Sequence, residues 1–311
     1  MPETDSPLVV VIGSVNIDHV VVADKFPSPG ETIMGRTALV TLGGKGSNQA
    51  VAAALGGART AMIARVGADA EGERARGGLA GRGVDVSGVA SVAEDETGTA
   101  WITVAAGDNT IIVIAGANHR WPADGDPLDG SGETAAVVLT QLEVPLDVVH
   151  RAAANTRGQF LLNAAPAAEL PDELIELCDV LIVNEHEQAV VARQTGNGED
   201  PADPAAVRRA HLALRERGAG AVVTTLGSAG AIVTDAEGTT TAIGSPPASV
   251  VDTTGAGDAF AGVLAARLAA GDSLLEAARW GTAAGSLAVR ATGAQESYAD
   301  LDTLRTLVEE N

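Results

Sequence analysis

The sequence predicts one α/β domain over residues 1–311, with a mostly parallel central sheet and helices on both of its faces. From about residue 60 onward, short apolar runs typical of buried strands alternate with segments of helical periodicity, and this alternation is typical of a parallel sheet. Two further pairs of strand-like segments have no helix between them, so we assign them to a small separate β-sheet. A chain of 311 residues can bury a large core without disulfides.

The main sheet and its helices are predicted segment by segment. Continuous apolar runs place strands at residues 8–13, 60–66, 136–142, 160–162, 180–183 and 221–226, with short strands at 231–234 and 239–243. Helical patterns place helices at residues 47–55, 72–83, 146–157, 171–177, 185–194, 205–217, 257–270, 274–290 and 300–310.

The small sheet is expected to form a lid, inserted into the domain from about residues 14–40 and 97–115. Its strands are predicted at residues 19–23 and 32–40, with a Pro-rich turn between them, and at 97–105 and 110–115. The exposed face of this lid is expected to pair with a second copy of the chain, so the sequence predicts a homodimer.

Composition excludes several classes of partner. The formal net charge is −21, and Lys25 and Lys45 are the only lysines. So acidic a surface argues against nucleic acid or an anionic membrane as partner, and any nucleotide site must be local, built from backbone amides and a divalent metal. The single cysteine, Cys178, the acidic N-terminus and the lack of an apolar run of about 20 residues predict a cytoplasmic protein.

The most informative stretch surrounds Asp258. An extended β-branched segment runs into Gly255, Ala256 and Gly257, and a long alanine-rich helix follows. Small residues at the start of a helix expose backbone N–H groups, which form an anion site together with the positive end of the helix dipole. A carboxylate beside such a site would repel phosphate. Asp258 is therefore either a base that accepts a proton from a hydroxyl during phosphoryl transfer or a helix cap.

A second glycine-rich stretch covers residues 43–48 and also precedes a helix. It is not a Walker A loop, because Lys45 is followed by Gly46, and it lacks the G-x-G-x-x-G spacing of a dinucleotide site. Glycines allow the backbone to approach a small ligand closely, while Lys45 and Asn48 can donate hydrogen bonds to hydroxyl oxygens. This combination suits a polyol.

Polar residues also follow several predicted strands. They are Asn16, Asp18, Gln141, Glu143, Asn184, Glu187 and the turn at residues 227–230. Parallel strands share one carboxyl edge, so we expect these residues to meet Asp258 along one crevice.

Two segments together resemble a known family. Residues 43–48 (Gly-Gly-Lys-Gly-Ser-Asn) and 252–258 (Asp-Thr-Thr-Gly-Ala-Gly-Asp) resemble the two signatures of the ribokinase family of carbohydrate kinases. The similarity extends from about residue 13 to residue 295. It implies a ribokinase-like fold and an ATP-dependent sugar kinase, and the first signature, with Asn16, Asp18 and Glu143, favours ribose over other sugars.

The resemblance also implies a role for each matching residue. Asp258 would accept the proton of the ribose 5-hydroxyl, while amides at Gly255, Ala256 and Gly257 stabilise the transferring phosphoryl group. The residues that would hold the sugar are Asn16, Asp18, Gly43, Gly44, Lys45, Gly46, Ser47, Asn48, Glu143 and Asp258. Those that would hold ATP and its Mg²⁺ are Asn184, Glu187, Thr225, Leu226, Gly227, Ser228, Ala229, Gly230, Gly257 and Thr282. Those that would hold an activating K⁺ are Asp252, Thr254, Ala288, Ala291, Gly293 and Ser297.

Other functions remain open at this point. The nearest alternative is a kinase of another small sugar, such as fructose, or of a nucleoside, although a chain with 2% aromatic residues offers few rings for a base to stack on. A non-catalytic sugar-binding regulator would have no reason to keep a carboxylate beside a phosphate site. A nicotinamide-dependent oxidoreductase is disfavoured by the missing glycine spacing, and a serine hydrolase by the missing G-x-S-x-G elbow.

Overall fold

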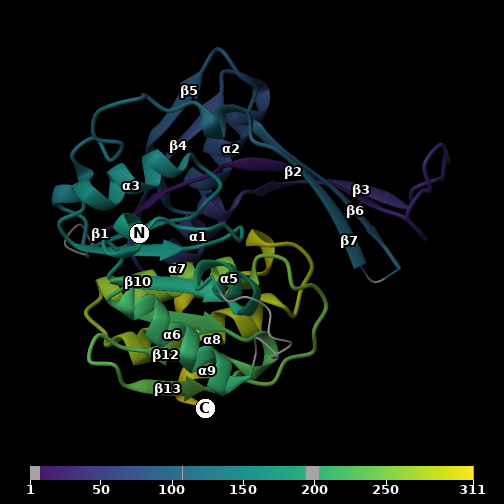
Figure 1. Cartoon of the computed structure of the whole chain (residues 1–311). Helices are drawn as coiled ribbons and strands as arrows, with labels where there is room; N and C mark the ends of the chain where they lie inside the picture. The colour runs from purple at the N-terminus through teal and green to yellow at the C-terminus, as the bar shows by residue number, and fades with distance from the viewer. Residues whose placement is uncertain (1–7, 107, 194–202, 311) are drawn as a thin grey trace.

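A nine-stranded sheet forms the centre of the protein (Figure 1). The computed structural model describes residues 8–106, 108–193 and 203–310. Within them the strand order is β13-β12-β11-β10-β9-β8-β1-β4-β5; the β11–β12 and β12–β13 pairs are antiparallel, and the other pairs are parallel. The strands are β1 (Leu8–Ile12), β4 (Arg59–Gly67), β5 (Val84–Val92), β8 (Val137–Thr140), β9 (Gln159–Asn163), β10 (Val180–Asn184), β11 (Ala221–Thr225), β12 (Ala231–Thr234) and β13 (Thr240–Ile243).

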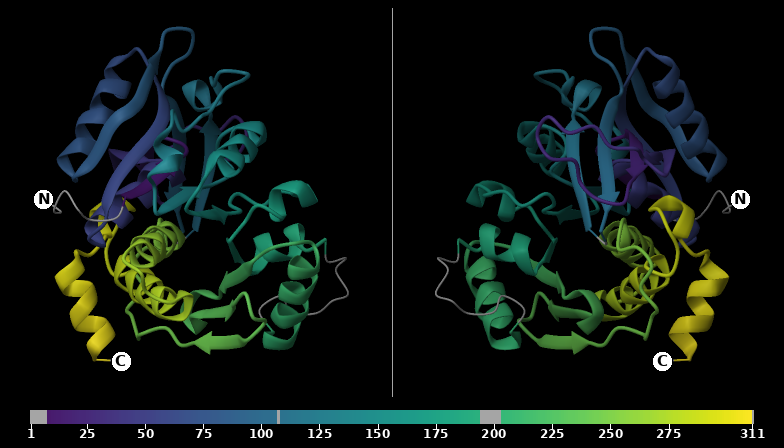
Figure 2. Two further views of the ribbon diagram at one scale, coloured as in Figure 1. Left: turned by 90° about the vertical axis from the view of Figure 1, so that its left-hand side faces the viewer. Right: turned by 90° about the vertical axis from the view of Figure 1, so that its right-hand side faces the viewer.

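Helices cover both faces of this sheet, as Figure 2 shows. Alternate residues of β1 enter two different cores: Val9 and Val11 belong to one, Val10 and Ile12 to the other. The first core is closed by α1 (Lys45–Leu55), α2 (Ala70–Gly81), α7 (Ala256–Ala269) and α8 (Leu274–Ala288). The second is closed by α3 (Leu146–Asn155), α4 (Asp172–Ile175), α5 (Glu185–Val191) and α6 (Pro204–Glu216), and α9 (Leu301–Glu309) packs outside α7 and α8. Because both faces of the strands are covered, the strands read as continuous apolar runs.

A separate four-stranded sheet projects from the main body (Figure 1). Its order is β3-β2-β6-β7, with β2 and β6 parallel and the other two pairs antiparallel. The strands are β2 (Asn16–Val22), β3 (Thr37–Gly43), β6 (Gly98–Ala105) and β7 (Asp108–Ile114). Its apolar residues are unusually exposed for a sheet: Trp101 is 50% exposed, and Ile112 is 68% exposed. None of the helices in the described part of the chain is long and apolar enough to cross a membrane.

The structure corrects the predicted elements in several places. Strand β2 begins at Asn16 and not at residue 19. Strand β3 begins at Thr37 and not at residue 32, and it continues to Gly43, so it leads directly into α1. Strand β5 was absent from the prediction because its apolar residues alternate with polar ones; it lies at the edge of the sheet and, among the described residues, pairs only with β4. Helix α1 begins at Lys45, two residues earlier than expected. Residues 1–7 and residue 194, the predicted end of a helix, lie outside the described residues.

Candidate active site

Asp258 lies in the first turn of α7 and is only 7% exposed. The helix starts at Gly255, whose φ of 76° is left-handed and therefore favours glycine. Both oxygens of the Asp258 carboxylate accept hydrogen bonds from α1: Oδ2 from Asn48 Nδ2 at 3.0 Å and Oδ1 from Gln49 Nε2 at 2.9 Å. The carboxylate is thus oriented by side chains of another helix and does not serve as the N-cap of its own.

Close packing of α1 against α7 makes these bonds possible. Gly262 lies one turn after Asp258 on the same face of α7. A β-carbon at Gly262 would stand 2.4 Å from the backbone oxygen of Gln49 and 2.6 Å from the β-carbon of Ala52. Only glycine allows the helices to approach this closely, and the short amide side chains of α1 then reach the carboxylate.

The start of α1 is held in a polar pocket. Glu143 accepts a hydrogen bond from the backbone N–H of Lys45 at 3.0 Å and another from Ser14 Oγ at 2.5 Å. Burial alone would lower the pKa of Lys45, but three carboxylates around it hold that pKa above its ordinary value. They belong to Asp258, Glu143 and Glu187. The Lys45 ammonium is therefore the positive centre of an otherwise acidic site.

Asp18 and Asn16 face the same pocket from the small sheet. The carboxylate of Asp18 lies against Gly43, and its Oδ1 has no hydrogen-bond partner among the described residues. Burial, followed by the charges of Glu143, Glu296 and Asp258, raises the pKa of Asp18 to about 7. The neighbouring side chain, Asn16, accepts a hydrogen bond from Asn118 Nδ2 at 2.7 Å. A buried carboxylate oxygen without a donor is a site for a ligand hydroxyl.

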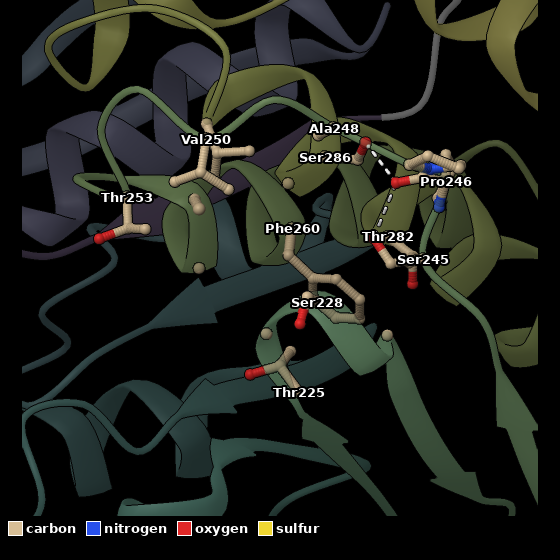
Figure 3. Close-up of a pocket in the computed structure, with 17 residues that line it drawn as sticks. Thr225, Ser228, Ser245, Pro246, Ala248, Val250, Thr253, Phe260, Thr282 and Ser286 are labelled. Atoms are coloured by element: carbon tan, nitrogen blue, oxygen red, sulfur yellow. Dashed lines mark hydrogen bonds between the residues drawn. The ribbon is translucent and has the colours of Figure 1, made fainter.

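A cavity of about 430 Å³ opens on the other side of the α7 N-terminus (Figure 3). That volume is typical of small-molecule sites. Six of the residues predicted to hold ATP line the cavity, namely Thr225, Gly227, Ser228, Gly230, Gly257 and Thr282. Leu226 and Ala229, predicted with them, are not among its lining residues. Figure 3 shows Thr225, Ser228 and Phe260 among the lining residues, and Ser286 Oγ donates to the carbonyl of Pro246 in the wall, at 3.0 Å.

Asn184 and Glu187, also predicted for the nucleotide, lie outside the lining of this cavity and form the N-terminal capping box of α5. The Asn184 side chain accepts from the N–H of Glu187 at 2.8 Å, and the Glu187 carboxylate accepts from the N–H of Asn184 at 2.9 Å. Burial raises the pKa of Glu187, which the charge of Lys45 partly opposes and that of Asp258 reinforces. Glu187 is therefore close enough to Lys45 and Asp258 for their charges to act on it.

Three of the residues predicted for K⁺ are hydrogen-bonded to one another in the Asp252 loop. Asp252 accepts hydrogen bonds from the N–H and hydroxyl of Thr254, at 2.9 and 2.7 Å, and from the N–H of Gly293 at 2.9 Å. The same loop contacts the end of α8, where Val289 O accepts from the N–H of Asp252. Helix α8 ends at Ala288, so its negative dipole end lies beside the loop. Ser297 lies in the following 3₁₀ turn, after Ala291, and its hydroxyl donates to Ala294 O.

Four side chains at the site were not among the predicted residues. They are Gln49, Asn118, Asn163 and Gln295, all buried amides. Gln141, also a buried amide, was expected in the crevice at the strand ends, and its hydrogen bond to Gln49 connects it to Asp258. Gln49 could have been suspected from position alone, because it directly follows Asn48 in the glycine-rich signature. The other three come from chain segments far from the signatures.

Comparison with known proteins agrees with this geometry. Buried polar side chains lie on one side of Asp258, and a cavity of small-molecule size lies on the other. Residues 6–301 match the model of the pfkB family carbohydrate kinase. The chain belongs to this family.

Several similar proteins are ribokinases. The chain is 36% identical over 292 residues to the ribokinase of Haemophilus influenzae, covering 92% of this chain and 94% of that one. It is 36% identical over 291 residues to the ribokinase of Bacillus subtilis, with the same coverage. Among solved structures, Arabidopsis thaliana ribokinase complexed with ribose and ATP superposes with a TM-score of 0.90 at 32% identity, covering 99% of both chains.

Proposed function

We propose that this protein transfers the γ-phosphoryl group of ATP to the 5-hydroxyl of D-ribose, forming D-ribose 5-phosphate. One observation carries the proposal: two adjacent residues of α7 face two different sites. Gly257 lines the 430 Å³ cavity, and Asp258 is bonded to Asn48 of the sugar-binding signature. A hydroxyl bound beside Asp258 would therefore lie next to the phosphate end of a nucleotide in the cavity. The names and ligands of the similar ribokinases support the choice of substrates.

Asp258 supplies the acceptor for the hydroxyl proton. Each of its oxygens already accepts one amide, which leaves lone pairs free for the sugar. A carboxylate is a weak base for an alcohol, but in a loose phosphoryl-transfer transition state the proton leaves late, so orientation matters most. The N–H groups at the start of α7 stabilise the charge on the transferring group without moving.

Side chains on the other side of Asp258 hold the sugar. Asp18 offers an unpartnered, buried carboxylate oxygen to a ribose hydroxyl. Asn16, Asn48 and Glu143 add further amide and carboxylate oxygens, and Lys45 adds a cationic donor. The glycines of residues 43–46 leave the backbone open for close approach of the sugar ring.

The residues present fit two metal ions. Mg²⁺ on a nucleotide needs only one or two protein carboxylates beside the phosphates, and Glu187 with Asn184 supplies such a set. K⁺ would be held by the Asp252 loop and the carbonyls at the end of α8, where a carboxylate and a helix C-terminus favour a cation. Mg²⁺ would neutralise phosphate charge, and K⁺ would support the conformation of the loop that leads into the α7 N-terminus.

The test is ATP consumption by the purified protein against a panel of pentoses, hexoses and nucleosides, each with Mg²⁺ and with or without K⁺. We expect ribose to give the highest kcat/KM, ADP and a sugar 5-phosphate as products, and stimulation by K⁺. A preference for fructose or a nucleoside would move the assignment to another kinase of the family. A lack of turnover with every sugar of the panel would overturn the assignment.

We also propose that the four-stranded sheet acts as a lid and mediates a cytoplasmic homodimer. The use of ATP as phosphoryl donor supports a location in the cytoplasm. The pairing is supported by apolar side chains that remain open on the sheet, among them Trp101, Ile112 and Ile114, with exposed fractions of 50 to 68%. Sedimentation equilibrium should report a dimer, and Ile112→Asp should shift it toward monomer. A wild-type monomer at high concentration would contradict the pairing.

A further inference from the structure

Buried amide side chains connect the Asp258 carboxylate to three other elements. Gln49 Nε2 donates to Asp258 Oδ1 at 2.9 Å, and Gln141 Nε2 donates to Gln49 Oε1 at 2.6 Å. On the other oxygen, Asn48 Nδ2 donates to Asp258 Oδ2 at 3.0 Å, and Gln295 Nε2 donates to Asn48 Oδ1 at 3.0 Å. Each oxygen of the carboxylate is therefore the end of a two-amide arm. We call them the Gln49 arm and the Asn48 arm.

The negative charge of Asp258 determines the direction of every bond in both arms. The carboxylate can only accept, so Asn48 and Gln49 must turn their NH₂ groups toward it. Their carbonyl oxygens then face outward and need donors, which Gln295 and Gln141 supply. The cost appears at the outer ends, where the carbonyl oxygens of Gln141 and Gln295 have no hydrogen-bond partner among the described residues. The chain retains this arrangement despite two buried, unsatisfied acceptors.

Each arm is anchored in a different part of the fold. Gln141 follows β8 and Gln49 lies in α1; the second proton of the Gln49 amide goes to Asn163 Oδ1, at the end of β9, at 2.9 Å. Gln295 lies in the segment after Gly293, beside the Asp252 loop, and also donates to Ser47 Oγ at 3.0 Å. Gln49, Gln141 and Gln295 are 0 to 3% exposed, so water does not replace these bonds.

We propose that Gln49, Gln141 and Gln295 are positioning residues that hold the Asp258 carboxylate in the orientation needed to accept the sugar proton. The inference rests on the proposed kinase function. Gln141 acts only through Gln49, because it donates to the carbonyl oxygen that Gln49 turns away from Asp258 and so holds the amide in place. Gln295 acts through Asn48, which also belongs to the sugar pocket. The two arms should therefore differ in their kinetic effects.

Methionine substitutions test the Gln49 arm, since methionine has nearly the volume of glutamine and donates no hydrogen bond. Gln49→Met should lower kcat about tenfold to a hundredfold, the range for loss of a hydrogen bond to a charged group, with the KM for ribose within about twofold. Gln141→Met should lower kcat by about threefold to tenfold, because the buried Gln49 carbonyl then loses its donor and the amide is held less firmly against Asp258. In the double variant, Gln141→Met should cost nothing beyond Gln49→Met.

Gln295→Met tests the Asn48 arm. It should lower kcat by a similar factor and also raise the KM for ribose by about threefold to tenfold, because Asn48 loses the donor that fixes its amide in the sugar pocket. Gln295→Met also remains as a test of the proposal if the variants with Gln49→Met do not fold. Unchanged kinetics in Gln295→Met would overturn the role of this arm.

Gln188→Met is the matched control. Gln188 is also fully buried and accepts a side-chain hydrogen bond, from Thr224 at 2.7 Å, but no hydrogen bond in the described part of the chain joins its side chain to either arm. Its kcat should remain within about twofold of wild type, whatever stability it loses. Equal losses in Gln188→Met and Gln49→Met, or additive losses in the Gln49–Gln141 double variant, would overturn the positioning role. Wild-type turnover in the same assay tests the proposed function separately.

Discussion

The two sides of Asp258 present different chemistry to their ligands. The sugar side is built from buried ionisable and amide side chains, with Asn16 3% and Asn48 6% exposed. The nucleotide side has no charged residue among those that line the cavity in the described structure, only glycines, prolines, hydroxyls and apolar groups. In a chain of net charge −21, phosphate cannot be attracted by the surface as a whole. If the proposed function holds, the comparison teaches that side chains would recognise the neutral sugar, whereas backbone amides and a metal would recognise the phosphates.

Removing Asp258 should have the largest effect on catalysis, because this residue lies between the two sides. Asp258→Ala should lower kcat by about 10²–10⁴, the usual contribution of a positioned acid or base. Ribose binding should remain measurable by calorimetry, since the other side chains of the pocket stay in place. A variant with near-normal turnover would show that the carboxylate only supports the packing of α1 and α7.

Asp18 offers the next largest effect and distinguishes binding from stability. Its hydrogen bond to a ribose hydroxyl would be charge-assisted, so Asp18→Asn should weaken ribose binding by about tenfold to a hundredfold. The folded protein raises the pKa of Asp18 from 3.8 to about 7, so the neutral acid is favoured. Ionisation therefore costs the wild type stability as pH rises from about 4 to 7, by roughly 4 kcal/mol in total. The variant lacks this cost.

Denaturant unfolding at pH 5 and pH 8, without ligand, measures that cost. Asp18→Asn should gain stability over the wild type on going from pH 5 to pH 8, and ribose titrations of both proteins give the binding term. If the variant were less stable than the wild type at pH 8, the ionised Asp18 carboxylate would not destabilise the ligand-free protein.

His211, which is bonded to Thr224 of β11, gives the stability of the protein the opposite pH dependence. It lies in α6, fully buried beneath β11 and β12, with Thr234 and Thr224 hydroxyls at 2.7 Å from its two ring nitrogens. Burial lowers the pKa of His211 from 6.5 to about 4, so the neutral ring is favoured. The contribution of the neutral ring to the free energy of unfolding is complete above pH 6.5 and is lost as pH falls toward 4. The loss amounts to about 2–3 kcal/mol by pH 4.5.

Unfolding measurements in the Asp18→Asn background isolate this slope, because the Asp18 effect has the opposite sign over the same range. Asp18→Asn alone should lose stability between pH 7 and pH 4.5, and adding His211→Gln should flatten the plot of stability against pH in that interval. Equal slopes with and without His211 would assign the acid sensitivity to other groups.

The sequence predicted the parts of the fold and site that depend on local patterns. The main-sheet strands buried on both faces were visible as apolar runs, and Asp258 stood out as a carboxylate among glycines. Strand β5 escaped because an edge strand alternates polar and apolar residues like a solvated surface. Gln295 and the positioning role of Gln141 escaped for another reason: both depend on contacts with α1 residues, 247 and 92 positions away. An amide gives no sign in the sequence of which group it will face.

The smallest effect is expected on the nucleotide side. Ser228 lines the cavity through a neutral hydroxyl on an exposed turn, so Ser228→Ala removes at most one neutral hydrogen bond to the nucleotide. Such a bond contributes about 0.5–1.5 kcal/mol, which corresponds to a rise of about twofold to tenfold in the KM for ATP, and we expect the low end because the turn is open to water. The KM for ribose and kcat should not change, which steady-state kinetics with each substrate varied in turn will show. A loss comparable to that of Asp18→Asn would mean that side chains recognise the nucleotide as strongly as they recognise the sugar.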